Sequence, residues 1–188
     1  VDLRARNAAD SANAAGALTY RDATGFDVAA AQTTSTVTLT GGGALTQSGA
    51  MTGSTLTAKT LSDAGAAITF SNAGNEFTTV DLRARNAADS ANAAGVLTYR
   101  DATGVDVAAA RSASPVTLTA GGTVTQSGAI EATTLTVKTL SDAGAAITLD
   151  TAANEVATVD LRARNAADSA NAAGALTYRD ATGFDVAA

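Results

Sequence analysis

The sequence predicts an all-β protein, a parallel β-solenoid, and three observations lead to this fold class. The chain repeats itself, because positions 1–79 return as positions 80–158, and internal repeats are typical of stacked architectures. Short segments of alternating apolar and polar residues recur roughly every 20 residues, which is the usual length of one solenoid rung. Aromatic residues make up only 4% of the chain, so a thin core suits it better than a thick globular one.

The repeat defines the predicted domain organisation. Residues 1–30 return at 80–109 with two substitutions and at 159–188 with none. We therefore assign repeat 1 to residues 1–79, repeat 2 to residues 80–158 and a partial repeat 3 to residues 159–188, all within one continuous solenoid. Because the chain begins without Met and ends inside a repeat, we interpret it as a fragment of a longer repetitive protein.

Five short segments of alternating residues are the predicted strands of one repeat and the start of the next. They begin at Val1, Leu18, Val37, Leu56 and Val80, so the first three steps are similar in length and the last is longer. These steps predict about four rungs of about 20 residues in each repeat. Stacked in register, the segments give two inward columns, because alternate residues of a strand face opposite sides. The first inward column would be Val1, Leu18, Val37, Leu56, Val80, Leu97, Val116, Leu135, Val159 and Leu176.

The Ala-rich segment 5–17 and its copies leave two alternatives open. Ala is the best helix former, so the segment could be helical. It lacks a stripe of large apolar residues at helical spacing, however, and its Asn, Ser and Ala residues suit close-packed turns of a coil equally well. We favour turns of the coil.

Composition excludes several classes of function. The chain has no Cys and no His, which removes thiol and imidazole chemistry and the usual zinc ligands, so we predict no metal, no cofactor and no catalytic residue. Its formal charge of −6 argues against a nucleic-acid partner. No apolar run is long enough to span a membrane. The carboxylates Asp22 and Asp27 are the only candidate acid/base residues. Their copies in successive repeats would lie about 19 Å apart, which is too far for two copies to act on one bond, so we predict that the protein is not an enzyme.

Two outward columns are candidate binding surfaces. A basic column could contact an anionic polysaccharide, although it could equally be a solvated face. Its residues are Arg4, Arg21, Lys59, Arg83, Arg100, Lys138, Arg162 and Arg179. A Thr column that includes Thr19, Thr38 and Thr57 resembles the ladders of ice-binding solenoids, but Asp replaces Thr in every fourth rung. Thr is also favoured in strands generally.

Four sequence patterns carry a resemblance to a known family. They are GG-x-(L/V)-TQSGA, SDAGAAIT, NE-x-x-TVDLRARNAA and LTYRDATG-x-DVA. With them the chain resembles the repeats of large bacterial exported adhesins of the filamentous haemagglutinin type, which are secreted by a partner transporter. The resemblance implies a right-handed parallel β-helix located outside the cell, at the bacterial surface. It implies roles in adhesion, aggregation or biofilm.

We therefore expect a structural protein that forms a rod, stalk or filament. Its expected partners are neighbouring repeats, identical chains and a host or matrix polysaccharide. The alternatives are a binding module whose basic column engages anionic polysaccharide and, less favoured, an ice-binding surface formed by the Thr ladder.

Overall fold

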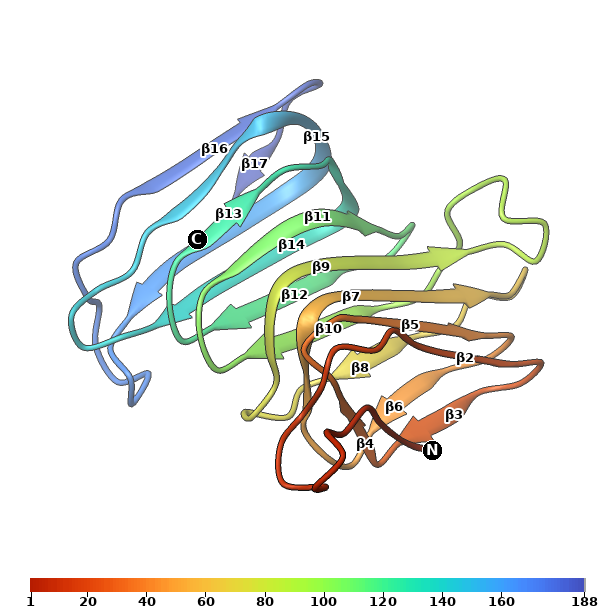
Figure 1. Ribbon diagram of the computed structural model, residues 1–188. Helices are drawn as coiled ribbons and strands as arrows, with labels where there is room; N and C mark the ends of the chain where they lie inside the picture. The colour runs from red at the N-terminus through yellow and green to blue at the C-terminus, as the bar shows by residue number, and fades with distance from the viewer. Residues whose placement is uncertain (188) are drawn as a thin grey trace.

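The computed structural model describes residues 1–187, which form strands, turns and loops but no helix (Figure 1). The prediction of an all-β chain built from tandem repeats is confirmed. The strands are β1 (Asp2–Arg4), β2 (Leu18–Asp22), β3 (Phe26–Val28), β4 (Ala30–Gln32), β5 (Thr36–Gly41), β6 (Leu45–Gln47), β7 (Met51–Leu61), β8 (Ile68–Phe70), β9 (Glu76–Arg85), β10 (Leu97–Asp101), β11 (Val105–Arg111), β12 (Val116–Ala120), β13 (Val124–Gln126), β14 (Ile130–Leu140), β15 (Ile147–Arg164), β16 (Leu176–Asp180) and β17 (Asp185–Val186).

All pairings between these strands are parallel, and two long ladders run through the molecule. Ladder A joins β2, β5, β7, β9, β11, β13, β15 and β16 in that order. Ladder B joins β3, β6, β8, β10, β12, β14, β15 and β17. The long strand β15 contributes its first residues to ladder A and its last residues to ladder B. We call one circuit of the chain, from a strand to the strand paired above it, a course.

Counting courses corrects the predicted rung number. Seven pairings along ladder A lead from Leu18 to Leu176, which are equivalent positions two repeats apart. One repeat therefore occupies three and a half courses of about 23 residues, rather than four of about 20. The half course has a consequence for symmetry. The segment LTYRD lies on ladder A in repeats 1 and 3 (β2 and β16) but on ladder B in repeat 2 (β10).

The first inward column is predicted correctly for the strands within a repeat, but its steps from one repeat to the next are wrong. Leu18, Val37, Leu56 and Val80 pair in succession as expected. Val80 does not pair with Leu97, however, but with Val107 in β11. Leu97 instead continues ladder B, above β8. The predicted steps from Val1 to Leu18 and from Val159 to Leu176 fail in the same way, because β1 pairs with β4 and β16 pairs with the first part of β15.

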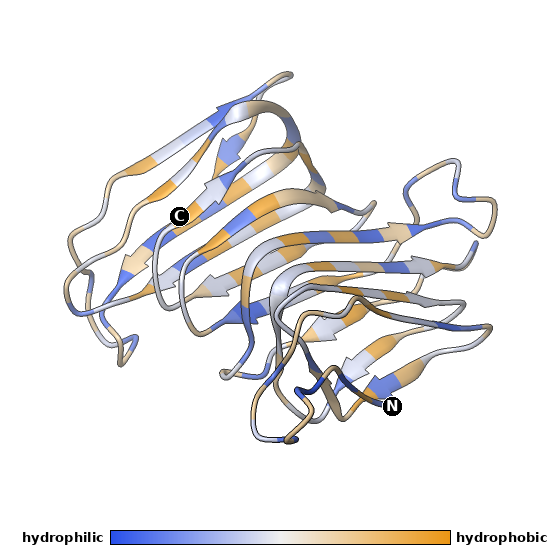
Figure 2. Cartoon of the chain, in the orientation of Figure 1, coloured by the Kyte–Doolittle hydropathy of each residue, from blue (hydrophilic) through white to orange (hydrophobic). Residues whose placement is uncertain are grey.

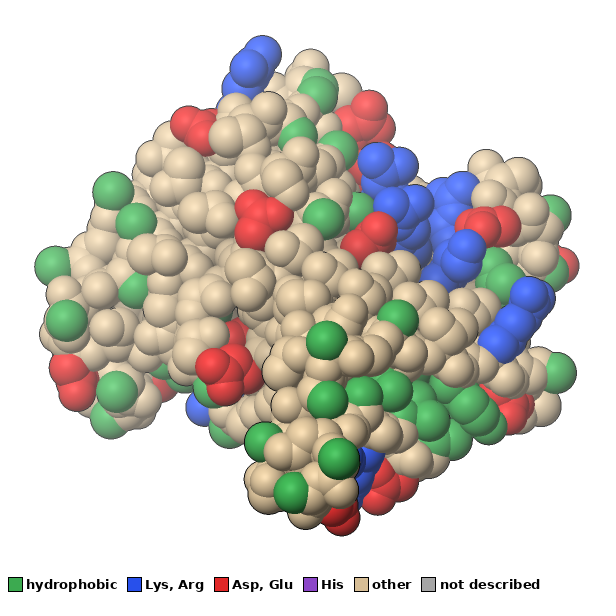
Figure 3. All heavy atoms as spheres, viewed as in Figure 1, with side chains coloured by type: hydrophobic (Ala, Val, Ile, Leu, Met, Phe, Trp, Pro, Cys, Tyr) green, Lys and Arg blue, Asp and Glu red, His purple; other side chains and the backbone are tan. Residues whose placement is uncertain are grey.

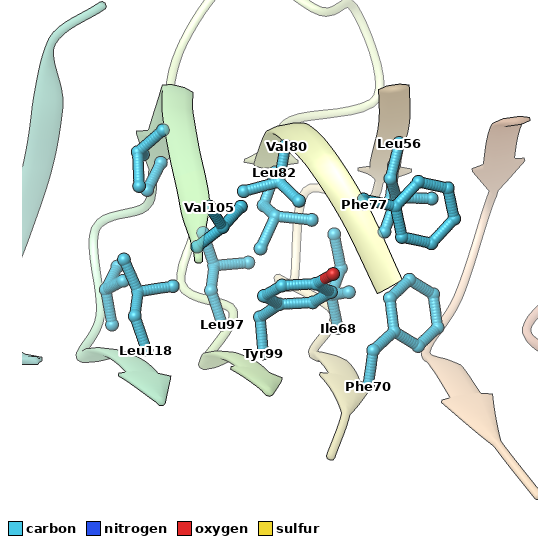
Figure 4. Close-up of a cluster of buried hydrophobic side chains, with 14 of the residues drawn as sticks. Leu56, Ile68, Phe70, Phe77, Val80, Leu82, Leu97, Tyr99, Val105 and Leu118 are labelled. Carbon is cyan, nitrogen blue, oxygen red and sulfur yellow. The ribbon is translucent and has the colours of Figure 1, made fainter. Parts of the chain in front are cut away.

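The core is a thin layer of side chains between the two ladders. Figure 4 shows Leu56, Val80 and Val105 from ladder A facing Ile68 and Leu97 from ladder B. All five are at most 4% exposed. The alternation of apolar and polar residues along the strands is visible in Figure 2, and it places most apolar residues inside and their polar neighbours outside. Leu176 and Val186, in the last two strands, are exposed.

A buried amide joins the courses at one corner of the coil. Asn75 is fully buried, and its side chain accepts a hydrogen bond from the Met51 N–H and donates one to the Arg100 carbonyl. Gln47 bonds the same amide from the course below. Asn154 repeats the arrangement in repeat 2 with Gln126. Every polar group placed here has a partner, so the corner fixes the register of three successive courses without the cost of an unpaired buried amide.

The Ala-rich segments form projecting loops, and the turn interpretation is confirmed. In the second copy, between β9 and β10, Asn86 accepts hydrogen bonds through its side chain from the N–H groups of Ser90 and Ala91. The Arg85 guanidinium crosses the base of the loop to Asp89 and Asn92. In Figure 1 this loop and the third copy, between β15 and β16, project on opposite sides of the molecule. Their positions agree with the half course per repeat.

Candidate functional site

The structure divides the predicted basic column into two. Arg21, Thr40, Lys59 and Arg83 occupy successive courses of ladder A. Their counterparts from repeat 2 occupy successive courses of ladder B: Arg100, Thr119, Lys138 and Arg162. Arg4 lies apart from both, at the start of a row that continues with Gln32, Thr52 and Glu76. Arg179 lies in β16, the last strand of ladder A. The eight residues therefore do not form a single ridge.

Arg111 extends the ladder A column and was missed by sequence reasoning. It pairs in register with Arg83 on one side and with Glu131 on the other, and its guanidinium Nε lies 3.3 Å from the Glu131 carboxylate. Figure 3 shows the Lys and Arg side chains gathered near the loop between β9 and β10. A comparison of the repeats could have found Arg111, because Gln32 stands at the same position of repeat 1.

Most of the predicted basic residues form ion pairs within the protein. Arg4 and Arg83 contact the Asp two positions earlier in the same strand, with Nε to Oδ1 distances of 2.7 and 2.6 Å, and Arg162 contacts Asp160 at 2.6 Å. Lys59 and Lys138 contact the Asp of the projecting loop of the next repeat, Asp89 and Asp168.

The remaining three basic residues have a different environment. Arg21, Arg100 and Arg179 belong to the LTYRD segments, and none forms an ion pair with a residue in the described part of the chain, 1–187. These three therefore have the charge most readily available to a ligand.

The charge pairs shift the titration of their acidic members. The hydrogen bond from Arg4 lowers the pKa of Asp2. Hydrogen bonds from Lys59 and Arg85 lower the pKa of Asp89, although its partial burial acts in the opposite direction. Both carboxylates remain ionised at neutral pH. Asp89 joins the projecting loop to Lys59 in the preceding course. Because the pairs are largely exposed, we expect each to contribute little to folding stability.

The Thr column is also split. Thr19, Thr38 and Thr57 follow one another on ladder A, and the next residue in the register is Asp81. In repeat 2 the block Thr98, Thr117, Thr136 and then Asp160 lies on ladder B. Each Thr block is therefore three courses long, about 10 Å from first to last strand, and consecutive blocks face different sides. A long flat Thr surface is not formed.

The candidate carboxylates make structural hydrogen bonds. Asp101 accepts from the Tyr99 hydroxyl, from the Phe77 N–H and from both the N–H and the hydroxyl of Thr103. Burial, together with the Asp101 charge, raises the pKa of the Tyr99 phenol, which therefore stays protonated and donates. Asp106 accepts from the hydroxyls of Thr125 and Ser127 in the next course. In repeat 1 the equivalent Asp22 accepts from Tyr20 and Thr24, and Asp27 accepts from Thr46 and Ser48. Among the described residues, Asp22 has no counterpart of the Phe77 N–H.

Within residues 1–187 there is no cluster of three or more acidic side chains placed to hold a metal ion. No helix in this part of the chain is long and apolar enough to cross a membrane.

Parallel courses, two facing ladders and a repeated projecting loop define a tandem-repeat all-β protein. A family model described as repeats of unknown function (DUF5649) matches residues 15–82 and 94–161, and the chain belongs to this family. The two matches cover equivalent parts of successive repeats and leave 83–93, most of the projecting loop, between them. No curated protein and no solved structure matches the chain.

Proposed function

We propose that this chain is part of a right-handed parallel β-solenoid whose function is to form a long, stiff rod outside a bacterial cell, as a stalk, fibre or matrix strand. The observation that carries the proposal is the continuity of the two ladders through repeat boundaries. Strands β9 and β11 begin in different repeats, and they pair in parallel as strands within a repeat do, with one register shift between Val107 and Ala109. Each added repeat buries the apolar edge of its neighbour, so stability is expected to rise with repeat number.

The remaining features of the proposal rest on general rules and on resemblance. Parallel crossover connections are almost always right-handed. The extracellular, bacterial location and the role in adhesion, aggregation or biofilm rest on the similarity to exported adhesins of the filamentous haemagglutinin type. A non-catalytic role agrees with the use of the Asp22, Asp101 and Asp180 carboxylates as hydrogen-bond acceptors for neighbouring Tyr and Thr groups.

Particle length tests the rod. Chains of two, four and eight repeats would be measured by negative-stain electron microscopy. At a spacing of about 4.8 Å per course, each repeat is expected to add about 17 Å at constant width. Particles whose width grows together with their length would contradict the rod, and so would compact particles of any repeat number.

The basic columns favour a second candidate function, binding of anionic polysaccharide. The supporting observation is that Arg21 and Arg100 lie two courses from the Lys of the same column, with one Thr between them. Neither has an acidic partner of its own in the described chain. Arg21→Glu with Arg100→Glu is expected to abolish salt-sensitive retention on an alginate column, because two free charges are reversed. Arg83→Glu with Arg162→Glu is the control, since these residues are already paired. Equal retention of both variants and the original chain would exclude this function.

A further inference from the structure

A polar groove of about 410 Å³ lies along one side of repeat 1 and ends at the first turn of repeat 2. The side chains that line it include Asn13, Thr34, Thr52, Ser54, Thr78 and Thr103. They come from five different segments of the chain, and none of these residues belongs to the basic columns described above.

The groove runs parallel to the stack of courses. The Thr34 N–H bonds the carbonyl of Ala14, and the Thr33 N–H bonds the carbonyl of Thr52. Thr52 pairs in register with Glu76. The turn that contains Thr103 lies above, because the neighbouring Asp101 carboxylate accepts the Phe77 N–H. Five successive courses therefore line the groove over about 19 Å. An extended polymer chain fits this shape better than a compact small molecule.

The lining is mostly uncharged and rich in hydroxyl groups. Thr34, Ser54 and Thr78 are exposed, and their hydroxyls make no hydrogen bond to any residue that the structure describes. Each hydroxyl can both donate and accept. Among the described residues that line the groove, only Glu76 is charged. Phe77 is 1% exposed and offers no ring face to a ligand.

A peptide strand is a less suitable occupant. The strand backbones at this corner are already paired with their neighbours, so an added strand has no free edge to join. Recognition must therefore use the side-chain hydroxyls, which suit a ligand that itself carries hydroxyl groups along its length.

Differences between the repeats concentrate at this groove. Repeats 1 and 2 differ at 20 of 79 positions, whereas the loop 5–16 is identical to its copy. Of the nine repeat 1 residues that line the groove, seven are among the differences: Thr33, Thr34, Thr52, Gly53, Ser54, Phe77 and Thr78. At the position of Thr52, repeat 2 has Glu131, which accepts a hydrogen bond from Asn92 at 2.7 Å and pairs with Arg111. Thr34 and Thr78 are both replaced by Ala in repeat 2.

Gly53 and Phe77, which lie beneath the exposed hydroxyls of the groove, also differ between the two repeats. In repeat 1 a Cβ on Gly53 would lie 2.7 Å from the Ser35 carbonyl oxygen and 2.8 Å from the Phe77 ring, so both groups pack too closely for a larger residue there. Repeat 2 has Ala132 and Val156 at the two positions. The same framework thus carries a groove with one charged side chain in repeat 1 and a corner with the Arg111–Glu131 ion pair in repeat 2.

From the shape, the free hydroxyls and the concentration of differences, we propose that the groove of repeat 1 binds a linear, uncharged polysaccharide, which lies along the rod and exchanges hydrogen bonds with Thr34, Ser54 and Thr78. The proposal does not depend on the rod function, because particle length and ligand binding are measured separately.

The test uses the second repeat as the source of substitutions that the fold already accommodates. The groove variant combines Gln32→Arg, Thr34→Ala, Thr52→Glu and Thr78→Ala. The control variant combines Ala17→Val and Ala44→Thr, which are likewise taken from the second repeat but lie outside the groove. The probes are linear oligosaccharides of glucose, mannose and galactose. An alginate oligosaccharide and an extended Ser/Thr-rich peptide serve as comparison ligands, and binding is followed by NMR titration.

At least one neutral oligosaccharide is expected to shift the amide signals of Thr34, Ser54 and Thr78 at millimolar concentration. The groove variant is expected to bind at least roughly tenfold more weakly, as the loss of two or more hydrogen bonds predicts. The control variant is expected to bind like the original chain. The proposal is overturned if no neutral oligosaccharide binds, if the groove variant binds equally well, or if only alginate or the peptide produces these shifts.

Discussion

Asp101→Ala is expected to reduce the free energy of unfolding by about 3–5 kcal/mol, because it leaves several buried donors without an acceptor. Asp101 is 1% exposed and accepts the Tyr99 hydroxyl at 2.6 Å and the Phe77 N–H at 2.9 Å. Alanine can accept neither bond, and water has little access to this corner. Urea denaturation of the whole chain measures the loss.

Two control variants separate the network from general damage to the core. Tyr99→Phe removes one donor and leaves Asp101 with its other partners, so it is expected to cost only about 1 kcal/mol. Asp22→Ala removes the equivalent carboxylate from β2, where the partner Tyr20 is only half-buried, and a smaller loss than at Asp101 is expected. If Asp101→Ala were no more destabilising than Asp22→Ala, the buried network would not be a main source of stability.

Spin labels on the projecting loops are expected to alternate between the two sides of the molecule. The chain contains no Cys, so single cysteines at the exposed positions Ala9, Ala88 and Ala167 can be labelled in pairs without background. Ala9 and Ala167 are seven courses apart on the same side, and their labels are expected about 34 Å apart along the axis. The label at Ala88 should lie on the other side, halfway between them along the axis.

Double electron–electron resonance on the three pairs of labels gives the required distances. If the loops alternate, the distance between labels 88 and 9 equals the distance between labels 88 and 167. Each of these two distances also exceeds half of the distance between labels 9 and 167, by an amount set by the width of the molecule. If the three labels instead lay on one line, with the two shorter distances together equal to the longest, the half course would be wrong. The four-rung alignment predicted from sequence would then be favoured.

The sequence was sufficient for the strands and insufficient for the path between them. Alternation of apolar and polar residues located β2, β5, β7 and β9, and steps of equal length placed Leu18, Val37 and Leu56 above one another. The step from Val80 to Leu97 is almost as long, but it does not bring Leu97 into register with Val80. Most of its residues leave the coil and return at nearly the same point, where the Ala93 N–H bonds the Ala84 carbonyl. The chain therefore advances only half a course.

The candidate site divides in the same way. Residue type and strand position were enough to identify the basic residues of each repeat, because outward positions follow from the alternation. Which of them are free for a ligand depends on contacts across courses, such as the one between Lys59 and Asp89, which are far apart in the sequence. The groove depends on five segments from Asn13 to Thr103, and its position could not be derived without the register of each pairing.

Because each repeat advances the chain by three and a half courses, odd and even numbers of repeats give different orientations. Inserting or deleting one repeat turns everything beyond it to the opposite side of the stack of courses, whereas a change of two repeats restores the original orientation. An odd change in the number of repeats would therefore redirect any element that follows them, without altering any of its residues. Whether the repeat count is odd or even therefore decides which way the end of the molecule faces.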